Sequence, residues 1–139
     1  MFTLFKYKKF EPGKFKNIVY FSKMDLLTLN SLGHTIGLHS HSHPTILKKL
    51  SHQKQKKEYN DNVNLLSKIL KIDKSSIKTM SHPSGSYNFG TLKILINLGI
   101  KLGFKNIMNS QSQTGTKKTN TSDLEIPRQD HIPILKRIN

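Results

Sequence analysis

The sequence predicts an α/β fold with parallel strands, on three observations. Amphipathic helical segments alternate with short strand-like segments, and two unusual loops, at residues 39–44 and 81–88, each follow a strand-like segment. Such alternation is typical of parallel sheets covered by helices, where chemistry gathers at the carboxyl ends of strands. With 139 residues the chain suffices for one domain but is short for a closed (β/α) barrel, which needs roughly 200 residues or more.

The individual elements follow from apolar periodicity and from glycine positions. The clearest helix spans residues 54–71, because Tyr59, Val63, Leu66 and Leu70 recur at helical spacing while lysine and asparagine fill the opposite face. The same reasoning predicts the remaining elements: helices over residues 24–32 and 91–98, ending before Gly33 and Gly99, and strands over residues 18–21, 35–38, 77–80, 100–104 and 124–126.

The net charge of +15 has two interpretations. The first is binding to nucleic acid or to another anionic surface. The second is a lysine-biased composition, which the residues favour. Of the 23 basic residues, only Arg128 and Arg137 are arginine, and the lysines are scattered over the whole chain. Proteins that read nucleic acid rely on arginine for bidentate contacts and on interleaved aromatic residues for stacking, so nucleic acid is not the favoured partner.

Composition also limits the location and the type of metal site. The chain has no cysteine, so disulfides and thiolate metal sites are excluded and a metal would need histidine and carboxylate ligands. No apolar run approaches the roughly 20 residues that span a bilayer. The first residues contain no apolar stretch of the length that a secretory signal requires, so the expected location is cytoplasmic.

The richest chemical segment holds four of the seven histidines within ten residues, after a predicted strand and before a proline. Neutral imidazole is a common ligand of zinc. In an extended segment His39, His41 and His43 lie on one side, whereas a loop that curls lets His39 and His43 converge on one ion. The alternative is that these are ordinary loop or core histidines. The grouping favours a metal, and we expect structural roles for His34 and His52.

The second unusual loop, residues 81–88, is rich in turn-forming residues. Pro83 and Gly85 mark a turn, and Ser86 or Asn88 is a candidate cap of the helix that follows. Turn formation explains most of this segment. It does not explain why a histidine and Tyr87 lie there as well.

The loop at residues 39–44 resembles the second motif of the polysaccharide deacetylase family, the NodB-homology, carbohydrate esterase family 4-like proteins. That motif is His-Ser/Thr-x-x-His followed by Pro, and its two histidines bind the metal. The resemblance implies that His39 and His43 are metal ligands, with Ser40 as the conserved hydroxyl. It is clearest over residues 24–104 and implies that residues 1–139 form a single partial domain, a partial (β/α) barrel of the NodB-homology type.

The loop at residues 81–88 is similar to the third family motif, Arg-x-Pro-x-Gly followed by an aromatic residue. Ser81 occupies the arginine position, so the chain departs from the usual pattern there. The resemblance implies that Pro83, Gly85 and Tyr87 contribute to substrate binding. It also implies that the backbone N–H of Ser84 faces the developing oxyanion.

Other family motifs are harder to place. The first motif is an Asp-Asp pair that supplies the catalytic base and the third metal ligand, and the only acidic residues before His39 are Glu11 and Asp25. Neither matches, so the resemblance implies a chain that is truncated at its N-terminus. Asp130 and His131 are the candidates for the last motifs, in which an Asp and a general-acid His act. The alternative for this segment is an ordinary loop in which Arg128 and Asp130 pair.

The resemblance implies a metal-dependent hydrolase of carbon–nitrogen bonds other than peptide bonds. Its expected substrate is an acetylated amino-sugar polysaccharide or glycan, which loses N-acetyl groups, and its expected cofactor is a divalent metal, with zinc as the leading candidate. Two alternatives stay open. One is an inactive deacetylase remnant with at most metal or glycan binding, and the other is a basic nucleic-acid-binding protein.

Overall fold

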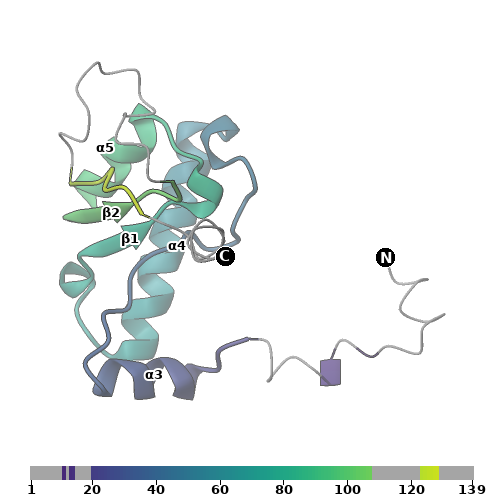
Figure 1. Ribbon diagram of the computed structural model, residues 1–139, viewed down its shortest axis with the longest axis vertical. Coiled ribbons are helices and arrows are strands. Elements are labelled where there is room, and N and C mark those ends of the chain that lie inside the picture. The colour runs from purple at the N-terminus through teal and green to yellow at the C-terminus, as the bar shows by residue number, and fades with distance from the viewer. Residues whose placement is uncertain (1–10, 12, 15–19, 108–122, 129–139) are drawn as a thin grey trace, which may run out of the picture. The chain divides into compact units, whose positions relative to one another are not determined.

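The computed structural model describes residues 11, 13–14, 20–107 and 123–128, in two compact units that comprise residues 1–34 and 35–139 (Figure 1). The first unit contains one described helix, and the second contains a parallel sheet with its helices. In chain order the elements are α3 (Lys23–Ser31), η1 (Leu47–Lys49), α4 (His52–Leu70), η2 (Lys74–Ser76), β1 (Thr79–Ser81), η3 (Pro83–Gly85), α5 (Phe89–Asn97) and β2 (Leu102–Phe104).

Helix α3 in the first unit begins with a reciprocal cap. The backbone N–H of Asp25 donates to Ser22 Oγ (3.2 Å), and the backbone N–H of Ser22 donates to Asp25 Oδ2 (2.7 Å). The helix gives way to Gly33, whose φ of 87° is a left-handed value that favours glycine. The helix predicted over residues 24–32 is therefore confirmed, with each end one residue earlier than predicted.

The sheet of the second unit is parallel and follows the order of the sequence. Thr79 pairs with Leu102 and Ser81 with Phe104 in the β1–β2 ladder. Parallel bridges from Leu38 to Met80 and from Phe104 to Ile126 add a chain segment on each side. Four neighbouring segments thus run in the same direction, with α4 and α5 as crossovers between consecutive segments, which is the arrangement of a (β/α) barrel.

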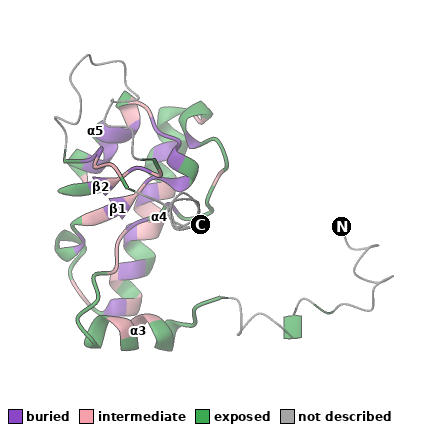
Figure 2. Cartoon of the chain, in the orientation of Figure 1, coloured by how far each residue is buried: buried purple, intermediate pink, exposed green. Residues whose placement is uncertain are grey.

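The core lies where α4 and α5 pack together and cover the sheet. The predicted apolar stripe of α4 is confirmed, since Figure 2 shows buried segments repeating along this helix. Both helices begin at side-chain caps, Ser51 on α4 and Asn88 on α5. The most buried apolar side chains come from every part of the second unit: Leu38, Leu47, Tyr59, Ile77, Met80, Tyr87 and Leu95.

None of the described helices combines the length and the apolar character needed to cross a membrane.

Candidate metal centre

The parallel sheet brings the two unusual loops together at the carboxyl ends of its strands. His39 directly follows the bridge residue Leu38, and Ser81 is the last residue of β1, the neighbouring strand. The His39 ring reaches across, with its Nδ1 at 2.8 Å from the Ser81 carbonyl oxygen and 2.9 Å from Ser81 Oγ. A carbonyl oxygen only accepts, so Nδ1 carries the proton and Nε2 keeps its lone pair for a ligand bond.

His43 lies beside His39. The two ring centroids are 4.9 Å apart with the ring planes tilted by 53°, and both side chains are exposed. The loop between them curls sharply, because Ser40 and His43 both have left-handed backbone angles, φ of 60° and 53°. The Ser40 hydroxyl accepts the backbone N–H of His43 at 3.2 Å, which closes the curl.

The surroundings of His39 favour its neutral form. Partial burial of the ring lowers the pKa of His39, the hydrogen bond to the Ser81 carbonyl opposes that effect, and the electrostatic influence of His43 and Arg128 lowers the pKa further. Only neutral imidazole binds a metal, so these neighbours favour the ligating form.

A hollow of about 230 Å³ opens beside His39 on the face of the sheet. Its lining comes from two neighbouring strand segments, residues 35–39 and 79–81, and from Phe104 on the next strand. The lining residues are Thr35, Gly37, Leu38, His39, Thr79, Met80, Ser81 and Phe104.

The second loop buries most of its side chains. Pro83, Gly85 and Tyr87 are all buried, whereas Ser84 is exposed at the apex. Ser84 and Gly85 have φ values of 49° and 63°, both in the left-handed region. The left-handed φ favours glycine at position 85, and an added methyl group would in addition force the Asn106 side chain to shift.

Beneath this loop lies a buried polar stack that the sequence did not reveal. The His82 ring packs on Tyr87 with centroids 4.0 Å apart, and its Nε2–H donates to the Leu124 carbonyl oxygen (2.8 Å). The Tyr87 hydroxyl donates to Glu125 Oε1 at 2.7 Å. His82 Nδ1 has no hydrogen-bond partner within the described part of the chain. Burial lowers the pKa of His82 to about 4, so the ring stays neutral.

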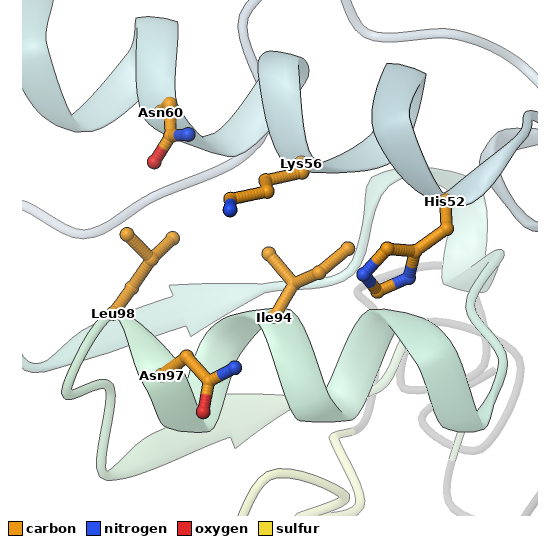
Figure 3. A pocket seen from close by; sticks show the side chains of 6 residues that line it. All are labelled: His52, Lys56, Asn60, Ile94, Asn97 and Leu98. Carbon is orange, nitrogen blue, oxygen red and sulfur yellow. The ribbon is translucent and has the colours of Figure 1, made fainter.

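The remaining residues singled out in the sequence lie away from the histidine pair or outside the described part of the chain. His34, for which we expect a structural role, is the last residue of the first unit. His52, for which we expect the same, lines a separate hollow of about 200 Å³ between α4 and α5 (Figure 3). All the residues that line this hollow belong to α4, to α5 or to the residue that follows α5, so the hollow is distinct from the site of the histidine pair at the ends of the strands. Asp130 and His131 lie outside the described residues.

The residues present fit two nitrogen ligands of a divalent metal. Both imidazoles are exposed and adjacent, and the hydrogen bond on Nδ1 of His39 leaves the opposite nitrogen available. Over residues 20–107 and 123–128, no cluster of three histidine or carboxylate side chains has metal-binding geometry. The two histidines would therefore supply two of the three protein ligands that a catalytic zinc site usually has.

A comparison with models of known protein families shows to which family the chain belongs. The sequence model of the family described as polysaccharide deacetylase matches residues 16–103. The chain belongs to the polysaccharide deacetylase family. The match includes both unusual loops, and proteins of this family are generally metal-dependent and act on acetylated polysaccharides.

Solved structures of deacetylases share the fold. The Streptococcus pyogenes deacetylase PplD, in complex with acetate, has a TM-score of 0.65 and 23% identity, over 84% of this chain and 48% of that one. The BpsB deacetylase domain of Bordetella bronchiseptica has a TM-score of 0.59 and 14% sequence identity, and the match covers 79% of this chain and 48% of that one. BA3943 of Bacillus anthracis, a CE4 family pseudoenzyme, has a TM-score of 0.51 and 18% sequence identity, and the match covers 56% of this chain and 26% of that one.

These comparisons confirm the fold predicted from the sequence, part of a NodB-type deacetylase barrel. The chain spans about half of the length of PplD and of the BpsB domain. No functionally curated protein sequence matches it.

Proposed function

We propose that this polysaccharide deacetylase chain contributes two ligands, His39 and His43, to the divalent-metal site of an N-deacetylase that acts on acetylated amino-sugar polymers. One observation carries the proposal. The two imidazoles lie side by side at the carboxyl end of the sheet, with Nδ1 of His39 held by the Ser81 carbonyl. Zinc is the expected ion, because imidazole and carboxylate are its usual ligands where cysteine is lacking.

The protein's own groups have distinct roles in this proposal. A bound divalent cation supplies Lewis acidity toward the acetamide carbonyl and the attacking water. The Ser81 carbonyl orients His39 and fixes its tautomer. In this proposal Ser84, the exposed residue at the apex of its loop, donates its backbone N–H to the oxyanion, and the buried Pro83 and Tyr87 hold the loop that carries it. Asp130 and His131 remain our candidates for the acidic partner and the general acid.

A second candidate function is metal or glycan binding without hydrolysis. The observation that favours it is the lack of a third histidine or carboxylate beside the pair among the described residues. The serine at position 81, where the family motif has arginine, points the same way. Metal binding under either candidate needs the histidine pair, so a metal titration tests what they share and acetate release separates them.

The experiment is a zinc titration of the metal-free protein, followed by an assay of acetate release from an N-acetylglucosamine oligomer. We expect one zinc per chain in the wild type and none in the double variant His39→Ala/His43→Ala. His52→Ala is the matched control, because His52 lies in the separate hollow between α4 and α5. Equal zinc content in all three proteins would contradict the proposed ligands. Zinc binding without acetate release would favour the second candidate.

A further inference from the structure

The backbone of the histidine loop is held by a carboxylate from a helix. Glu58 of α4 accepts three hydrogen bonds from this loop. Its Oε2 accepts the backbone N–H groups of His41 (3.0 Å) and Ser42 (2.8 Å), and its Oε1 accepts the Ser42 hydroxyl (2.7 Å). Hydrogen bonds to an ionised carboxylate are about twice as strong as neutral ones, so this is a firm attachment.

Asn62 extends the attachment by one helical turn. Its Oδ1 accepts the backbone N–H of His39 at 3.0 Å. Glu58 and Asn62 are four residues apart and therefore lie on the same face of α4. The helix itself cannot shift easily, because Tyr59 and Val63, next to these two residues, are buried in the core.

The loop needs such support because its conformation is strained. Left-handed backbone angles at Ser40 and His43 are unfavourable for residues other than glycine, and they persist where surrounding contacts enforce them. Side chains accept the backbone N–H groups of His39, His41, Ser42 and His43. Three of these four hydrogen bonds end on α4.

We infer that Glu58, assisted by Asn62, is a positioning residue of the metal site. It holds the loop in the curled conformation that places the His39 and His43 rings 4.9 Å apart. Both carboxylate oxygens of Glu58 accept hydrogen bonds from the loop, and Glu58 forms no metal-binding cluster with the two histidines among the described residues, so we assign it a role through the loop. The inference rests on the proposed metal-binding function of the two histidines.

The test compares three variants. Glu58→Ala removes every acceptor, and Glu58→Gln keeps the shape and one acceptor oxygen. Asp61→Asn is the matched control on the same helix, because the Asp61 carboxylate accepts a hydrogen bond from the exposed Lys57 instead of from the loop. Two quantities are measured: the zinc dissociation constant, and the hydrogen-exchange rates of the His41 and Ser42 amides in metal-free protein.

We expect zinc binding to weaken by about 10- to 100-fold in Glu58→Ala and by less in Glu58→Gln, with no change in Asp61→Asn. Exchange of the His41 and Ser42 amides should accelerate in the two Glu58 variants, while amides in the middle of α4 keep their rates. If Glu58→Ala does not fold, Glu58→Gln carries both readouts.

The outcomes separate this inference from the proposed function. Unchanged zinc affinity in the Glu58 variants, with a wild type that binds zinc, would overturn the positioning role. Unchanged exchange of the His41 and Ser42 amides would overturn the attachment itself. A wild type that binds no zinc would contradict the proposed function, whereas faster exchange of those two amides in Glu58→Ala would still support the hold of Glu58 on the loop.

Discussion

The loops at residues 39–44 and 81–88 follow neighbouring strands, yet they differ in which of their groups are exposed to solvent. The first loop exposes the imidazoles of His39 and His43 while its backbone N–H groups are bound by side-chain acceptors. The second loop buries His82 and Tyr87 in the core and exposes its apex at Ser84. The first loop thus leaves its histidine rings accessible, whereas the second places its ring side chains in the core.

The difference follows from where each loop is anchored. The first is attached to α4 mainly through its backbone N–H groups, and the contact of the His39 ring with the Ser81 carbonyl uses only Nδ1, so Nε2 of His39 stays available. The second is anchored by its own side chains, which stack and hydrogen-bond inside the core. Removing side chains from the two loops should therefore damage different properties, metal binding in the first and stability in the second.

The largest expected effect on stability comes from Tyr87→Ala. This side chain is 1% exposed and donates to Glu125, so its removal leaves a cavity and should lower the free energy of unfolding by about 3–5 kcal/mol. Urea unfolding measures the change. The matched control Tyr20→Ala, at a side chain that is 70% exposed, should change it by less than about 0.5 kcal/mol. A loss below about 1 kcal/mol for Tyr87→Ala would mean that the second loop is not anchored through this ring.

The next effect is a loss of stability in acid that originates at His82. Its pKa is about 4 in the folded protein, because burial disfavours the charged ring, against an ordinary value of 6.5. The unfolded chain binds the proton more readily, so stability is present above pH 6.5 and is lost as the pH falls toward 4, by at most about 3 kcal/mol.

Urea unfolding between pH 7 and pH 4 checks this expectation. His82→Gln supplies the control, since an amide can still donate to the Leu124 carbonyl but does not titrate. The variant should have a flatter pH profile than the wild type. Identical slopes in the two proteins would show that His82 is not the group responsible.

A smaller effect is expected at the turn of the second loop. Gly85→Ala should cost about 1–3 kcal/mol, because φ is left-handed and the new methyl group would collide with Asn106. Gly33→Ala measures the cost of the left-handed backbone alone, since Gly33 has a φ of 87° and no atom lies within 4 Å of the added methyl group. The difference between the two variants in thermal or urea unfolding reports the collision. Equal costs would mean that Asn106 moves aside freely.

The smallest effect is expected at His41. Its backbone N–H is bound by Glu58, but its side chain lies outside the His39–His43 pair. His41→Ala should therefore leave the zinc dissociation constant unchanged within about twofold, as measured by the same titration. A loss as large as that of His39→Ala would place His41 among the ligands and would contradict the curled arrangement.

Much of the fold was predictable because local signals agreed with the final packing. The stripe of Tyr59, Val63, Leu66 and Leu70 identified α4, and glycines marked the ends of helices. Strands were less well predicted, since the segment expected over residues 35–38 contributes only a single bridge at Leu38. Pairing of that kind depends on neighbours that are distant in sequence, and these are not visible in a local pattern.

The site was predictable where chemistry is concentrated in sequence and not where it depends on tertiary contacts. Four closely spaced histidines drew attention to the first loop. Glu58 was overlooked because an acidic residue on the polar side of a lysine-rich helix resembles a solvated position. His82 was overlooked as well, since its burial depends on tertiary packing and its hydrogen-bond acceptor, the Leu124 carbonyl, lies some forty residues away in the sequence.

The central claim is that His39 and His43 bind one metal ion through imidazole nitrogens left free by the fold. The most direct measurement is a zinc titration followed through the imidazole ¹⁵N resonances of all histidines. The account predicts saturable shifts of His39 and His43 at one zinc per chain, with Nε2 as the nitrogen that changes in His39 and Nδ1 still protonated. Shifts confined to other histidines, or none at all, would contradict it.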